Sequence, residues 1–220
     1  MQKTTALVSA VERALLAPTV HNTQPWRWRI GDSSVDLYAD WSRHLLSTDP
    51  DRRDLFLSCG AALDHLQVAL AAENVALHVQ RLPSPGDLGH LATLTVRDGS
   101  GAAAHAALSA AIERRRTDRR RMSWRPVPAR LVTQLVEAAD RRGALLVPVV
   151  EPHKRIRLLQ SVAEAGDAQD ASPGYSAELQ SWTRRYSAAR DGIPAASVPP
   201  PSLGGSSPSP LRRLPPGGLR

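Results

Sequence analysis

The 220-residue sequence predicts a mixed α+β fold. Three observations carry this prediction: short runs rich in β-forming residues, apolar stripes at helical spacing that alternate with them, and a hydrophobic fraction of 42% that can fill a core. No apolar run reaches the roughly 18 residues that a membrane span requires, so we expect no membrane association. The N-terminus lacks the layout of a signal peptide. With a single cysteine, Cys59, no intrachain disulfide can form, and we expect a cytoplasmic protein.

The first elements follow from apolar spacing and from turn residues. Residues 4–17 are expected to form a helix, because their apolar side chains repeat on one stripe and Pro18 ends the pattern. Residues 26–31 and 34–39 are expected to be two short strands. The Gly-Asp-Ser sequence at 31–33 predicts the turn between them.

A long helix is expected next, running to about residue 73. Asp49 is the predicted N-cap and Pro50 the predicted first helical residue, since proline is well tolerated there. Most of this helix is apolar, so it should be deeply buried. Two further strands are expected at 76–81 and 90–97, the second rich in β-forming residues.

The second part of the chain is expected to be mainly helical. Helices are predicted at 102–114, 128–142, 152–166 and about 175–188. The apolar run at 144–150 predicts a strand, weakened by the proline within it.

The composition changes from about residue 194 onwards. Eight prolines follow, separated mainly by Gly, Ser and Arg, and no hydrophobic periodicity survives. Such a segment cannot bury enough apolar area to offset its ordering entropy, so residues 196–220 are expected to be disordered. A natural linker and a change of reading frame in the coding sequence both remain open as explanations.

Two polar segments are candidates for chemistry. The 17–26 loop, Ala-Pro-Thr-Val-His-Asn-Thr-Gln-Pro-Trp, follows a predicted helix and precedes a predicted strand. Its Asn22 and Gln24 can both donate and accept hydrogen bonds, which suits the edge of a flat heterocycle. An ordinary Asn/Pro-rich connection is the simpler interpretation of this spacing alone. His21 could face a substrate, although a loop histidine is more often structural.

The second candidate is the basic segment, residues 114–121, which reads Arg-Arg-Arg-Thr-Asp-Arg-Arg-Arg. Residues 111–130 contain eight Arg and two acidic residues, so most of the formal charge of +7 is concentrated there. Arginine side chains and a hydroxyl can converge on a phosphate. A solvated helix face is the alternative, and nucleic acid is not expected because no aromatic residues are interleaved.

Together the two segments resemble the flavin-dependent nitroreductases. The 17–26 loop is similar to that family's Ala-Pro-Ser-x-x-Asn-x-Gln-Pro-Trp loop, and residues 115–119 are similar to its Arg-x-Ser-x-Arg start. Residues 60–63 and the helix after them resemble the buried helix beside the flavin. The stretch Asp40-x-x-Arg43 resembles the Acg-like branch, and the likeness covers about residues 1–195.

The order of the two segments differs from a standard member, in which the basic motif comes first. The resemblance therefore implies two fused nitroreductase-like halves: a full half at 1–107 and the beginning of a second, pseudo-symmetric half at 108–195, before the 196–220 tail. Standard members are homodimers in which each flavin takes its phosphate contacts from one subunit and its ring contacts from the other. Relatives with fused halves are expected to be pseudo-dimeric monomers. Full members of this branch continue further, so the resemblance implies a C-terminally shortened chain.

The resemblance implies FMN as the cofactor and NAD(P)H as the co-substrate. Its phosphate would be held by Arg115, Thr117 and Arg119, while the 17–26 loop would contribute Pro18, Thr19, Asn22 and Gln24. The partner would be a small-molecule acceptor such as a nitroaromatic or a quinone. No catalytic side chain is expected, because the flavin carries the chemistry. No metal is expected either, because the seven His form no ligand pair beside a carboxylate.

Two other functions remain open at this point. The chain could bind or store FMN without turnover, or it could be an inactive shortened product. Reduction of bound flavin by NADH or NADPH separates an enzyme from a storage protein.

Overall fold

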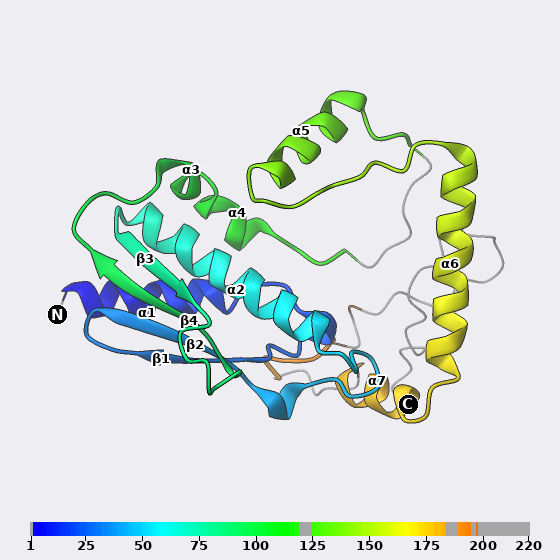
Figure 1. The fold of residues 1–220 in the computed structure, drawn as a ribbon, viewed down its shortest axis with the longest axis horizontal. Helices are drawn as coiled ribbons and strands as arrows, with labels where there is room; N and C mark the ends of the chain where they lie inside the picture. The colour runs from blue at the N-terminus through cyan, green and yellow to red at the C-terminus, as the bar shows by residue number, and fades with distance from the viewer. Residues whose placement is uncertain (1, 119–124, 184–188, 195–196, 198–220) are drawn as a thin grey trace.

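The computed structural model describes residues 2–118, 125–183, 189–194 and 197, and it has the α+β architecture that the sequence predicts (Figure 1). Four strands form one antiparallel sheet in the order β1-β2-β4-β3. Each predicted strand of the first part is confirmed, within one residue: β1 (Trp26–Ile30), β2 (Ser34–Ala39), β3 (Ala76–Arg81) and β4 (His90–Arg97).

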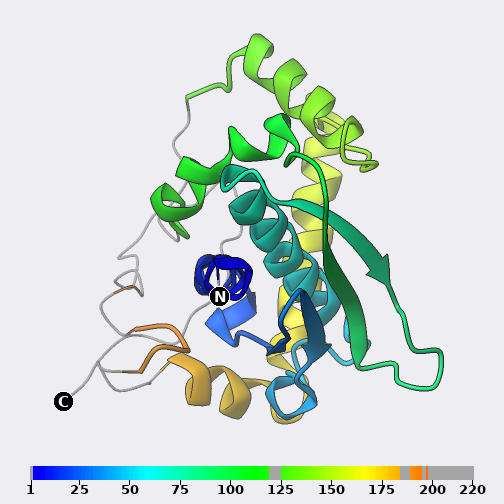
Figure 2. The ribbon, with the colours of Figure 1, turned by 90° about the vertical axis from the view of Figure 1, so that its left-hand side faces the viewer.

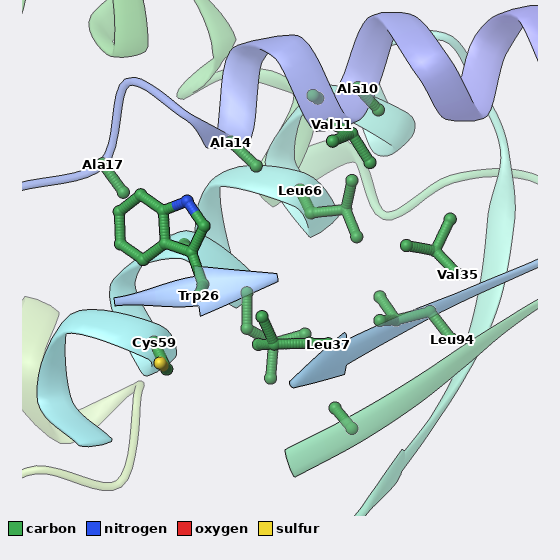
Figure 3. Close-up of a cluster of buried hydrophobic side chains, with 14 of the residues drawn as sticks. Ala10, Val11, Ala14, Ala17, Trp26, Val35, Leu37, Cys59, Leu66 and Leu94 are labelled. Atoms are coloured by element: carbon green, nitrogen blue, oxygen red, sulfur yellow. The ribbon is translucent and has the colours of Figure 1, made fainter. Parts of the chain in front are cut away.

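Two helices cover one face of this sheet, α1 (Gln2–Ala14) and α2 (Arg53–Ala72). Figure 2 looks along α1 and shows α2 beside it. Figure 3 shows the core between them, where Leu66 of α2 meets side chains from the sheet and from α1. Leu66 and Leu94 are completely buried. Side chains alternate between the two faces of β2, and its apolar residues point toward these helices. This face of the sheet therefore forms the core.

The first helix ends three residues earlier than predicted. Leu16 and Ala17 donate their N–H groups to carbonyls three residues before them, at 3.1 and 3.0 Å. The last turn is therefore tightened, as is common where a proline prevents the helix from continuing. Ala17 is buried at the start of the 17–26 loop.

The predicted positions of Asp49 and Pro50 at the start of the long helix are wrong, because the N-cap residue is Arg52. Asp49 nevertheless binds the first turn from three residues further back. The carboxylate of Asp49 accepts the N–H groups of Asp54 and Leu55 at 3.0 and 2.8 Å. The chain turns between Asp49 and Arg52, whose φ of 64° is left-handed. The helix consequently begins at Arg53, and Pro50 belongs to the turn that brings the Asp49 carboxylate into place.

The length and composition of α2 would allow it to cross a membrane. More than half of its apolar window, 56%, is nevertheless buried inside the fold. Its apolar side chains pack on α1 and the sheet, as expected for the central helix of a globular core.

The helix predicted at 102–114 is two helices, α3 (Ala103–Ala106) and α4 (Ser109–Arg114). The chain bends at Ala107 and Leu108, which lets α3 and α4 both contact α2 and buries Ile112. The later helices are confirmed with shifted ends: α5 (Ala129–Asp140), α6 (Pro152–Asp170) and α7 (Tyr175–Thr183).

The strand predicted at 144–150 does not form. This segment has no regular structure, and Leu145 is 90% exposed. A strand needs a neighbour to pair with, and none of the described strands lies in register beside it. Pro148 also lacks an N–H to donate. In Figure 1, α5 and α6 stand apart from the sheet layer.

The helix α7 returns to the first part of the chain. Glu178 accepts the backbone N–H groups of Ser47 and Thr48 at 3.1 and 2.9 Å, and the Thr48 hydroxyl at 2.7 Å. Leu179 is buried at this contact. The predicted extension of this helix to 188 and nearly all of the 196–220 tail lie outside the described residues.

A polar network on the outer face of the sheet leads to the first testable prediction. Burial alone would raise the pKa of Asp36, but hydrogen bonds from Thr93, Arg29 and His90 outweigh it and lower the pKa below 3.8. A lowered pKa stabilises the fold above the unfolded value, and the stabilisation is lost as the pH falls below it. We expect the free energy of unfolding to fall between about pH 5 and pH 3, and Asp36→Asn to cost about 1–3 kcal/mol at pH 7.

Urea denaturation at several pH values measures this effect. Asp32→Asn, at an exposed position in the neighbouring turn, is the control and should retain the native pH dependence. An unchanged acid dependence in Asp36→Asn would contradict the prediction.

Candidate cofactor site

The 17–26 loop has a strained backbone. His21, Asn22 and Gln24 have φ values of 51°, 55° and 50°, all in the left-handed region. Non-glycine residues rarely adopt this conformation, and such strain persists only where surrounding contacts enforce it. Clusters of this kind occur at ligand sites, because a strained loop presents its polar groups in a fixed arrangement.

Hydrogen bonds within the loop hold this conformation. The Thr19 hydroxyl accepts the N–H of Gln24 at 3.1 Å, and the Thr19 carbonyl accepts the N–H of Asn22 at 3.2 Å. Arg43 donates to the Thr23 carbonyl at 2.8 Å. The His21 side chain is only 4% exposed, so it lies inside the fold. Thr19 therefore acts on the loop backbone, while Pro18 beside it is exposed.

The side-chain amides of the loop face the 190–192 segment. Gln24 donates to the Arg190 carbonyl at 2.6 Å, and Asn22 donates to the Gly192 carbonyl at 3.1 Å. Arg43 links the two regions, because it also contacts the Asp191 carboxylate at 2.9 Å. Asn22 and Gln24 thus lie together, on one edge of the loop, as the heterocycle hypothesis requires.

The structure brings the basic segment to the 17–26 loop. Arg115 caps the C-terminal end of α4, and its Nη2 donates to the Leu16 carbonyl at 3.0 Å. Its Nη1 donates to the Thr117 hydroxyl at 3.2 Å. Arg115 and Leu16 are therefore in contact although they lie about a hundred positions apart in the sequence, and Leu16 directly precedes the loop. Arg119, the third predicted phosphate contact, lies outside the described residues.

Two neighbours of Arg115 carry no sequence motif. Arg13 of α1 donates to the Ser109 hydroxyl at 2.6 Å, and His65 of α2 lies within electrostatic range of Arg115. In the sequence, Arg13 lies between Ala10 and Ala14 of the buried stripe of the first helix. This spacing was the only sequence signal for where its side chain lies. Nothing in the sequence pointed to His65.

The fit of this cluster to a phosphate can be judged from its unpaired donors. The Nε atoms of Arg13 and Arg115 are buried and have no hydrogen-bond partner among the residues that the structure describes. Arginine N–H groups bind phosphate oxygens strongly, often in pairs. The cluster can therefore donate hydrogen bonds to an anionic oxygen. It lies at the end of α1, from which the chain continues into the 17–26 loop.

Cys59 is a buried thiol close to the loop, and it leads to a second prediction. Burial raises its pKa to about 12, and its Sγ lies 3.3 Å from the Pro25 carbonyl. Since the thiolate is the reactive form, we expect Cys59 to resist alkylation at pH 8 in the folded protein. Mass spectrometry after iodoacetamide treatment, with and without urea, checks this. Equal labelling in both samples would contradict it.

Comparison with known proteins identifies the family. No family model matches the chain. The chain is 42% identical over 187 residues to "Putative NAD(P)H nitroreductase Rv3131" of Mycobacterium tuberculosis, a region that covers 85% of this chain and 53% of that protein. It is 34% identical over 199 residues to "Putative NAD(P)H nitroreductase acg" of the same organism, covering 90% of this chain and 60% of that protein.

The α+β layer, with a strained polar loop beside an arginine cluster, is compatible with the nitroreductase fold. The identity to these relatives extends over most of the chain, and the chain belongs to the nitroreductase family. It spans 53–60% of the length of the two relatives described here.

Proposed function

We propose that this chain forms the FMN site of an oxidoreductase that uses NAD(P)H to reduce a small-molecule acceptor, such as a nitroaromatic or a quinone. The family supports NAD(P)H-dependent reduction in general, since two relatives bear that name. FMN itself, the acceptor and a cytoplasmic location belong to the proposal. We further propose the division into halves at 1–107 and 108–195 that the resemblance implies.

One observation carries the proposal: the bond from Arg115 to the Leu16 carbonyl. It joins the segment that resembles a phosphate-binding motif to the loop that resembles a ring-binding motif. Neither motif alone distinguishes a cofactor site from ordinary surface structure. Their meeting in space is what a composite site requires, because the two ends of one ligand must be bound at once.

Each group of residues has a distinct task in the proposed site. Arg115, with Thr117 and Arg119, would hold the phosphate by charge and hydrogen bonding. Asn22 and Gln24 would contact the edge of the ring, oriented by the loop backbone that Thr19 holds, with Pro18 beside them. FMN, when bound, supplies the hydride and electron transfer. The protein supplies orientation, and its positive charge favours the anionic reduced form of the cofactor.

The visible absorption of the purified protein, after addition of FMN and removal of the excess, tests this proposal. We expect flavin bands to remain with the protein and to be weakened in Asn22→Ala, because the ring contact is lost. Oxidation of NADH or NADPH by the loaded protein then tests turnover. Protein that stays folded but colourless would refute the proposed site.

A second candidate function is FMN binding without turnover. The observation that favours it is the contact of the loop amides with the 190–192 segment, since both Asn22 and Gln24 already donate to its carbonyls. A ring bound at these amides must share or displace those bonds. Anaerobic addition of NADPH to the loaded protein separates the two candidates, because only an enzyme bleaches the flavin bands.

A further inference from the structure

Three residues that are linked through interactions of His65 each contain a buried nitrogen atom without a partner in the described part of the chain. Nε of Arg13, Nδ1 of His65 and Nε of Arg115 are all buried, and none has a hydrogen-bond partner among the described residues. Buried polar atoms in folded proteins are nearly always paired, so three in one cluster require an explanation. Arg13, His65 and Arg115 come from α1, α2 and the end of α4, so tertiary packing has gathered them.

The surroundings of His65 favour the neutral form of its imidazole ring. Burial lowers its pKa, and the positive charge of Arg115 lowers it further. Asp64 and a backbone hydrogen bond with Arg13 act in the opposite direction but do not outweigh these effects. Two more charged side chains lie at the edge of the cluster: Glu113 contacts Arg13, and Arg142 pairs with Asp64.

A neutral imidazole donates from only one of its two nitrogens, whereas a protonated one donates from both. After burial, the positive charge of Arg115 is the largest effect that opposes protonation of His65. An anion bound beside Arg115 would offset that charge and favour the protonated ring. Its unpaired Nδ1 would then become a donor that can bind this anion.

We propose that His65 is a binding residue for phosphate: its imidazole takes up a proton from solvent when a phosphate group binds beside Arg115 and then donates Nδ1–H to that group. In the intact site this phosphate is that of FMN, so this part of the inference rests on the proposed function. Phosphate binding then adds a third positive charge, on His65, to those of Arg13 and Arg115. In the free protein this third side chain is mainly uncharged. Repulsion among the cations in the free protein is correspondingly lower.

Inorganic phosphate provides a test that does not need the flavin. The imidazole C–H resonances of His65 are followed by NMR over about pH 5 to 8, without phosphate and with phosphate at saturating concentration. We expect phosphate to raise the pKa of His65 by about one unit, since an opposite charge at contact distance has an effect of this size. His78, exposed on β3, is the internal control and should not shift. An unchanged His65 titration in phosphate overturns the proposal.

The second test uses FMN and riboflavin, which differ by the phosphate. Calorimetry at pH 7 in two buffers of different ionisation enthalpy measures protons taken up on binding. At this pH the FMN phosphate is mostly doubly charged, because its second pKa is about 6, so its own ionisation contributes little. We expect proton uptake with FMN, none with riboflavin, and FMN binding about tenfold weaker in His65→Asn than in the control His78→Asn.

The outcomes of the second test separate the two hypotheses. FMN binding without proton uptake, or with equal uptake in His65→Asn, overturns the role of His65 and leaves the proposed function standing. Failure of FMN to bind refutes the proposed function, while the phosphate titration still decides the role of His65.

Discussion

Replacing Leu66 by alanine is expected to lower the free energy of unfolding by about 2–5 kcal/mol. Leu66 is fully buried between α1 and the sheet, so its removal leaves a cavity in the hydrophobic core that joins the helices to the sheet (Figure 3). A loss of this size is a large fraction of the stability of a typical domain, which is about 5–15 kcal/mol. Urea denaturation followed by circular dichroism measures it.

The control is a leucine on the same helix. Leu57 is 68% exposed, so Leu57→Ala removes the same atoms without leaving a cavity. Both changes replace one good helix former by another, and helix propensity therefore cancels in the comparison. We expect Leu57→Ala to alter stability by less than about 0.5 kcal/mol. Equal effects at the two positions would mean that α2 is not the central core helix.

Replacing Arg115 by alanine is expected to weaken FMN binding by about 10- to 100-fold. Loss of hydrogen bonds to a charged group costs about 1.5–3 kcal/mol, and every 1.4 kcal/mol is a factor of ten in affinity. The change also removes the bond to the Leu16 carbonyl, so the position of the 17–26 loop is affected as well. Fluorescence quenching of FMN on titration with protein measures the dissociation constant.

Two variants separate these contributions. Arg114→Ala removes an equal charge at an exposed neighbour, whose Nε bonds only within its own helix in the part of the chain described, and it should leave affinity nearly unchanged. Arg115→Lys keeps the charge but loses the forked geometry, and we expect an intermediate affinity. Equal losses in Arg114→Ala and Arg115→Ala would indicate a general charge effect rather than a specific contact.

The sequence could predict the sheet layer because local and tertiary preferences agree there. The β-forming runs of β1 to β4 and the apolar stripe of α2 each have a partner to pack against within the first part of the chain. The apolar run at 144–150 has the same local signal, but none of the described strands pairs with it, and it stays irregular. A strand is stabilised by its neighbours, and local sequence alone does not reveal whether a neighbour exists.

For the site, the sequence by itself determined which residues are candidates: the 17–26 loop and the basic segment stood out by composition and by resemblance. Only the tertiary structure decided that Arg115 reaches the carbonyl that precedes this loop, and that Arg13 and His65 join it. The left-handed residues of the loop were also not predictable, because bonds from Thr19 and from the distant Arg43 enforce them. The physical reason is the same in each case. Residue type fixes what a side chain can donate, accept or carry as charge, whereas packing of distant segments fixes what it meets.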